Sequence, residues 1–233
     1  MVTDTCGSAL VGFLLSLTPL SNVLLGWRGA GGNGAAEVYV HAHKHRYKQL
    51  TSRSGAYYFF GGLLMILGSF LEFILGNTFP FVVFGSFGAF WLTFAATLTP
   101  AYNAAAAYQP EDPATAALNP TFNATFAYFQ VYMGVLCFVY MIVALRTNII
   151  FFLIFALLVP AFGCLAGVYF YAALGVTAHT LQHAAGGLTF ATCLLGWYLF
   201  FVQLLASVDF PLNLPVGDLS RFIKGASERA KAQ

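Results

Sequence analysis

Charged residues are scarce in this chain of 233 residues: ten side chains are basic and eight are acidic. A soluble domain of this size has about a quarter of its residues charged, so the shortage argues against a water-exposed globular fold. With 59% hydrophobic and 17% aromatic residues, the composition is typical of a protein surrounded by lipid. The net charge of +2 gives no indication of a nucleic-acid-binding surface, and we expect no nucleic-acid partner.

Basic residues are missing from most of the length of the chain. Lysine is absent between Lys48 and Lys224, and Arg146 is the only arginine between Arg53 and Arg221. A retinal pigment bound as a Schiff base needs a lysine inside a helix, so this class is excluded.

Cysteine and histidine form no metal-binding pattern. The four cysteines are widely spaced, which is typical of small core residues rather than of a disulfide framework. Three histidines alternate with basic residues between positions 41 and 46, and these cations would repel a metal ion. His179 and His183 flank the last predicted connection, where we expect a loop or interfacial role. The predicted spans offer no set of nucleophile, base and orienting acid, so we predict no enzyme, no catalytic residue, no metal and no cofactor.

Six segments are long and apolar enough to cross a bilayer, which takes about 20 mostly apolar residues. The predicted fold is therefore an all-α membrane protein, a six-helix bundle forming a single membrane domain over residues 1–233. The spans cover approximately residues 7–27, 56–75, 79–98, 124–145, 148–172 and 186–207. Very short connections predict that the second and third spans, and the fourth and fifth, form tight antiparallel hairpins.

The basic residues outside the spans predict the orientation. An even number of spans places both termini on one side, and each side carries five basic residues. Four of the five on the opposite side lie in residues 37–54, a stretch foreign to its surroundings that is either a regulatory loop or a mistranslated intron. Without this stretch the count is five to one. Both termini, including the polar tail of residues 208–233, are then predicted to be cytoplasmic.

Glu72 is the one acidic residue inside a predicted span. Burying a charge in hydrocarbon costs about 2.5–3.5 kcal/mol on insertion scales, so such residues usually face a bundle interior or a water-filled path. On a helix, Gly61, Gly68 and Glu72 share one face, which favours an interior position. In the alternative interpretation, Glu72 lies near the helix end and reaches the interface or caps a neighbour.

The segment Gly61 to Ala95 reads GGLLMILGSFLEFILGNTFPFVVFGSFGAFWLTFA and resembles the acetate uptake transporter family of YaaH-type acetate and succinate permeases. The resemblance is carried by the GG pair, by Glu72, by the GNTF turn that contains Asn77 and Thr78, and by SFGAFWL. Upstream LTPLS and GWRGAGGNGAA are similar to the fungal-type branch, and HAAG and LPVG extend the match further along the chain.

This resemblance implies a six-helix protomer in a homohexameric ring in the plasma membrane. It also implies transport of acetate and related short monocarboxylates, linked to protons or channel-like. The family's hydrophobic constriction corresponds here to Phe13, Phe87 and Leu158, which we call the gate. A ring of apolar side chains makes an anion shed water and excludes larger acids.

Two features depart from the family. The NPAPLGL signature of the first span is replaced by DTCGSAL, and Phe87 stands where members often have tyrosine. Loss of the hydroxyl leaves a more apolar gate. Two alternative functions are ammonium or ammonia export, an activity also linked to the family, and a non-transporting membrane sensor or structural protein.

Overall fold

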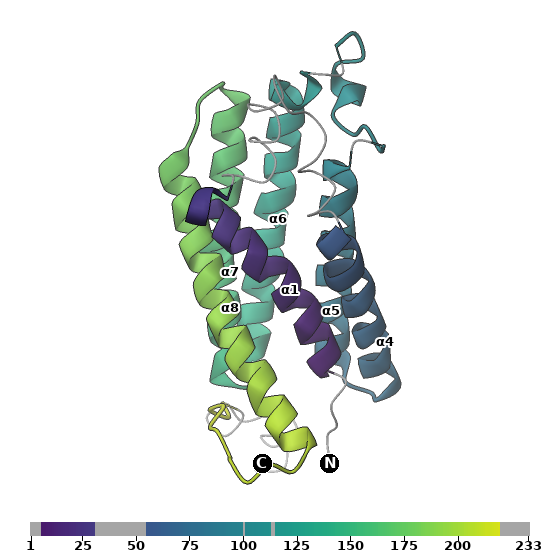
Figure 1. The fold of residues 1–233 in the computed structure, drawn as a ribbon, viewed down its shortest axis with the longest axis vertical. Coiled ribbons are helices and arrows are strands. Elements are labelled where there is room, and N and C mark those ends of the chain that lie inside the picture. The colour runs from purple at the N-terminus through teal and green to yellow at the C-terminus, as the bar shows by residue number, and fades with distance from the viewer. Residues whose placement is uncertain (1–5, 31–54, 100, 113–114, 220–233) are drawn as a thin grey trace, which may run out of the picture.

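The computed structural model describes residues 6–30, 55–99, 101–112 and 115–219, and it contains six helices long and apolar enough to cross a membrane (Figure 1). The predicted all-α fold with six spans is confirmed. The spans are α1 (Cys6–Leu24), η2 (Tyr57–Leu64) continuous with α4 (Met65–Ile74), α5 (Thr78–Leu98), α6 (Pro120–Ala144), α7 (Ile149–Ala173) and α8 (His179–Ser207). The η2 segment is π-helical, which the apolar pattern did not predict. The unusual stretch 37–54 lies outside the described residues.

The helices pack as an incomplete ring. α4 packs on α5 and on α1, α1 on α8, α8 on α7, and α7 on α6. The α4–α5 and α6–α7 turns lie at the same end of the bundle as the start of α1 and the end of α8 (Figure 1). We call this the hairpin end, and the opposite one the far end.

Two helices begin earlier than the sequence predicted. The fourth span starts at Pro120, because Asn119 caps it by accepting hydrogen bonds from the backbone N–H groups of Thr121 and Phe122. The sixth starts at His179 rather than near residue 186. Its first two turns carry exposed histidines, so they fall outside an apolar window although their backbone is helical. His179 and His183 therefore lie on a helix, not in a connection.

Glycines allow the η2–α4 span to lie close to α1 and α5. A Cβ added at Gly61 would lie 2.5 Å from Cγ of Trp91 and 2.7 Å from Oγ of Ser16. A Cβ added at Gly68 would lie 2.8 Å from Cβ of Ala9. Gly61, Gly68 and Glu72 are all buried, so the predicted small-residue face does point into the bundle.

Candidate functional site

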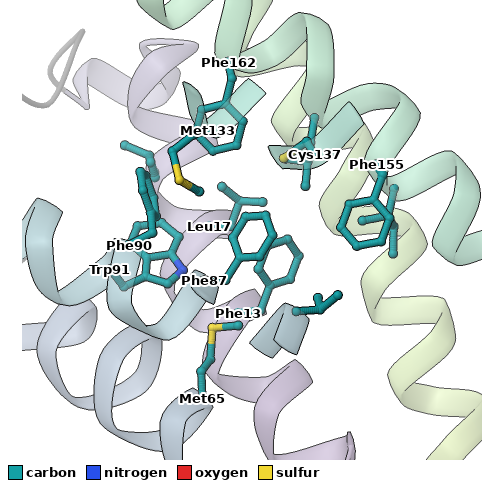
Figure 2. Close-up of a cluster of buried hydrophobic side chains, with 14 of the residues drawn as sticks. Phe13, Leu17, Met65, Phe87, Phe90, Trp91, Met133, Cys137, Phe155 and Phe162 are labelled. Atoms are coloured by element: carbon teal, nitrogen blue, oxygen red, sulfur yellow. The ribbon is translucent and has the colours of Figure 1, made fainter. Parts of the chain in front are cut away.

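Phe13 of α1 and Phe87 of α5 meet in the interior of the bundle. Their ring centroids are 6.1 Å apart and the ring planes cross at 80°, an edge-to-face contact. Their side chains are 6% and 4% exposed. Figure 2 shows the two rings next to each other within the buried cluster. Edge-to-face packing is a favoured geometry for aromatic pairs, so the two rings close against each other without a polar contact.

Aromatic contacts also fix the register of α5 against α7. Phe79 lies 6.4 Å from Phe155, and Phe90 lies 5.5 Å from Phe162, as measured between ring centroids. Both helices begin at the hairpin end, so they run parallel (Figure 1). In the described part of the chain α5 and α7 are not among the closely packed helix pairs, and they meet through these rings.

Leu158 lies in the same buried part of the bundle as Phe87. It follows Phe155 on α7, and Phe87 precedes Phe90 on α5, so both residues fall between the two ring contacts. Leu158 is 2% exposed and belongs to the same buried cluster as Phe13 and Phe87. The structure therefore places the three predicted gate residues in one buried cluster, with a direct ring contact between Phe13 and Phe87.

The environment of the gate is almost entirely apolar. The side chains around it come from five of the six spans and are buried (Figure 2). They include Leu17, Met65, Phe90, Trp91, Met133, Cys137, Phe155 and Phe162. Any solute that passes the gate must leave its water behind.

Glu72 lies apart from the gate, toward the hairpin end. Its side chain is 2% exposed, and its carboxylate accepts a hydrogen bond of 2.7 Å from the Asn77 amide. Ser69 of α4 packs beside Gly85 of α5, which sets Glu72 roughly 7.5 Å along the axis from Phe87 at 1.5 Å per residue. Thr78 is exposed at the first turn of α5. Glu72 therefore faces the bundle interior and, near the end of its own helix, also stabilises the turn that follows, so it has features of both interpretations given above.

Two buried polar groups near the gate were missed by sequence reasoning. The indole Nε1 of Trp91 and the amide Oε1 of Gln130 have no hydrogen-bond partner among the described residues. Each side chain is 1% exposed. Trp91 was hidden among many aromatic residues, whereas a glutamine in the middle of an apolar span is a signal that the sequence does contain.

At the far end, Asn22, Trp27 and Arg28 line a surface pocket. The Trp27 ring packs edge-on against Phe190 at 4.9 Å, which ties the end of α1 to α8. Arg28 is exposed, and its backbone has a φ of 52°. A cation beside this pocket favours the approach of an anion.

At the hairpin end, an extended segment after α8 crosses the start of α7. The backbone N–H of Ile149 donates to the carbonyl of Gly217 at 2.8 Å, and that of Leu219 donates to Thr147 at 3.0 Å. The Tyr198 hydroxyl donates to the carbonyl of Pro215 at 2.7 Å. The LPVG motif therefore lies in a segment fixed across this end, which we call the strap (residues 208–219). The rest of the predicted tail lies outside the described residues.

No group of three histidine, cysteine or acidic side chains suited to a metal ion is found in the parts of the chain that the structure describes. The alternating histidines near position 41 lie outside them.

Comparisons with known proteins give a consistent result. The sequence profile of the GPR1/FUN34/YaaH family matches residues 39–221. The protein alcS of Aspergillus fumigatus is 44% identical over 218 residues, which cover 92% of this chain and 74% of the relative. The acetate transporter protein patA of Aspergillus clavatus is 30% identical over 211 residues, covering 90% of this chain and 75% of the relative. The structure of the bacterial acetate channel SatP superposes with a TM-score of 0.69 at 20% identity, over 93% of this chain and 100% of that one, and so shares its fold.

Proposed function

Since the chain belongs to the GPR1/FUN34/YaaH family, we propose that it carries acetate and related short monocarboxylates across a membrane, as a transporter or a channel. The observation that carries the proposal is the closed contact between Phe13 and Phe87, with Leu158 in the same buried cluster, inside a six-helix bundle. The relative patA, whose name specifies acetate, aligns over 90% of the chain and supports this substrate.

An apolar gate selects its solute by size and by hydration. A small acid with one carboxyl group has less water to lose than a larger or doubly charged acid, and its methyl group packs favourably against phenylalanine and leucine side chains. A larger or doubly charged acid meets a steric barrier and a greater cost of dehydration. Arg28 at the far end gathers anions next to the path without entering the apolar zone.

The finer parts of the proposal concern assembly and setting. We place the protein in the plasma membrane with cytoplasmic termini, as a homohexamer with one path through each protomer and with transport linked to protons. The outward surfaces of α4 and α6 are rich in exposed large apolar residues, which suits contact with lipid or with neighbouring protomers. We propose no enzymatic activity.

Uptake of labelled acetate into vesicles tests the function. Wild-type protein is expected to give saturable uptake, and Phe87→Ala and Leu158→Ala are expected to change its rate or selectivity. Phe138→Ala is a matched control, because Phe138 is 48% exposed on the outer face of α6. Folded wild-type protein that gives no uptake would refute the proposal.

The two alternatives are separated by the same vesicles. Ammonium transport predicts a flux of ammonium that acetate does not reduce, whereas acetate transport predicts saturation by acetate and by its short homologues. A sensor or structural protein predicts no flux of either solute.

A further inference from the structure

Trp91 and Gln130 bring polar groups without hydrogen-bond partners among the described residues into a largely apolar region beside the gate. The indole of Trp91 is held firmly, because it stacks on Tyr57 with ring centroids 4.9 Å apart and packs on Gly61. In Figure 2 its nitrogen points toward Phe87 and the centre of the cluster. A buried donor without a partner costs about 1–3 kcal/mol. Because the indole is fixed in place, its N–H is suited to donate a hydrogen bond to a ligand that binds transiently.

Gln130 reaches the interior from the opposite side. Met133 and Cys137 follow it at three and seven residues along α6, so the three side chains share one helical face. Figure 2 shows Met133 and Cys137 turned into the cluster. The Gln130 side chain is 1% exposed, and its Oε1 atom has no hydrogen-bond partner among the described residues.

Ring contacts place the two groups at the same depth. Phe90 stacks on Phe129 at 5.8 Å, and Phe94 stacks on Phe126 at 6.1 Å, so α5 and α6 run antiparallel in this register. Trp91 directly follows Phe90 on α5, and Gln130 directly follows Phe129 on α6. Along the bundle axis the two residues therefore differ in depth by about the rise of one or two helical residues. Trp91 also lies one helical turn beyond Phe87, about 6 Å toward the far end.

We propose that the Trp91 indole N–H and the Gln130 amide form a binding station for the neutral, protonated form of a short monocarboxylic acid, one turn from the gate. This rests on the proposed function and specifies the form of the substrate that the site accepts. The carbonyl oxygen of the acid accepts from Trp91 Nε1, and the acid hydroxyl donates to Gln130 Oε1. The small alkyl group then lies against the apolar side chains near Phe87.

The electrostatics of this region favour the neutral acid over the anion. The described residues place Arg28 and Arg146 outside the spans, and they place the buried Glu72 carboxylate near the hairpin end. A carboxylate anion at the station would have no cation nearby to offset its desolvation, which is costly in an apolar interior. An acid that enters in its protonated form carries a proton across the membrane with it. One hydrogen-bonding site therefore accounts both for the selection of the neutral acid and for the coupling of transport to protons.

Acetamide is a suitable probe, because it offers the same carbonyl acceptor and a donor but carries no charge at any ordinary pH. The chain has three tryptophans, so nitrogen-15 labelling of tryptophan gives three indole N–H signals in detergent-solubilised wild-type protein. Acetamide is expected to shift the Trp91 signal in a saturable way. The Trp197 signal is an internal control, because its N–H already donates to Thr18 at 3.2 Å. A Trp91 signal that acetamide leaves unchanged would overturn the proposal.

Flux measurements give a second test. Trp91→Phe and Gln130→Leu are each expected to raise the KM for acetate about tenfold, the effect of losing about 1.4 kcal/mol of binding. Both should also relieve inhibition by acetamide. The matched control Trp197→Phe is expected to keep the wild-type KM.

The pH dependence separates the neutral acid from the anion. In wild-type protein the apparent affinity for acetate should fall from mildly acidic to mildly alkaline buffer in proportion to the protonated fraction, whereas inhibition by acetamide should not change. An affinity for total acetate that stays constant over this range would overturn the neutral-acid station while leaving acetate transport intact. Absence of acetate flux in the wild type would instead refute the proposed function.

Discussion

The side-chain amide of Asn77 donates a 2.7 Å hydrogen bond to the carboxylate of Glu72 across the turn that joins α4 to α5. The backbone N–H of Asn77 also donates to the carbonyl of Glu72, at 2.9 Å. Gly76 between them has a φ of 78°, a conformation that glycine adopts without strain. The acidic residue and the GNTF turn therefore form one structural unit.

Replacing Asn77 with alanine is expected to destabilise the protein by about 1.5–3 kcal/mol, because the buried carboxylate loses a donor. The measurement is the apparent melting temperature in detergent. Asn213→Ala is the control, since Asn213 is exposed on the strap. Equal melting temperatures for both variants would show that the Glu72–Asn77 bond contributes little.

Reducing the size of Phe87 is expected to loosen selectivity at the gate. In Phe87→Leu and Phe87→Ala the ring that meets Phe13 is lost, so longer monocarboxylates should gain relative to acetate, by about tenfold in the ratio of uptake rates. Competition assays in vesicles measure this ratio for variants that retain the wild-type melting temperature. Phe138→Ala should leave the ratio unchanged, and an unchanged ratio in the Phe87 variants would remove Phe87 from the gate.

A methyl group at Gly61 is expected to cost about 1–3 kcal/mol, because it would lie 2.5 Å from Cγ of the rigidly packed Trp91. Gly163→Ala provides a matched glycine with no neighbouring heavy atom within 4 Å of the added Cβ. That change should be neutral, or stabilising by up to about 1 kcal/mol through helix propensity. Thermal melting of both variants checks the difference, and a reversed order would contradict the packing shown here.

Removing the Tyr198 hydroxyl is expected to loosen the strap. Tyr198→Phe deletes the 2.7 Å bond to Pro215, so exchange of the Ile149 and Leu219 amide hydrogens, which form the backbone bonds between the strap and α7, should quicken without general unfolding. Tyr171→Phe, at an exposed position near the end of α7, is the control. Exchange rates equal to those of the wild type would mean that the backbone bonds to α7 suffice to hold the strap.

Hydropathy predicted the number of spans and the two tight hairpins, because a bilayer requires long apolar helices whatever their side chains do. It misplaced the start of α8, because the polar turn around His179 and His183 does not differ from a loop in composition. Hydropathy also did not predict the π-helical form of η2. In an almost wholly apolar segment, the pattern of apolar residues does not distinguish a π-helix, with hydrogen bonds between residues five apart, from an α-helix, with bonds between residues four apart.

The gate was predicted from family resemblance rather than from chemistry. One phenylalanine in a chain with 25 of them carries no local signal, and Phe87 and Leu158 enter one buried cluster only when the bundle assembles. Trp91 likewise carries no local signal in the sequence, because it is distinguished by an indole N–H that has no hydrogen-bond partner among the described residues. Sequence patterns record which groups are present, whereas hydrogen-bond satisfaction depends on which groups meet.

The π-helical η2 segment makes the spacing between residues in the second span as important as their identity. One residue added to or removed from an α-helix rotates everything beyond it by about 100°. Deleting Ile66 from the α-helical part of the span would therefore turn Gly68 and Glu72 relative to Gly61 and out of their buried positions, while the span stays as apolar as before. Such a deletion would pass every composition-based test for a membrane helix and would still remove the close contact between Gly68 and Ala9 of α1.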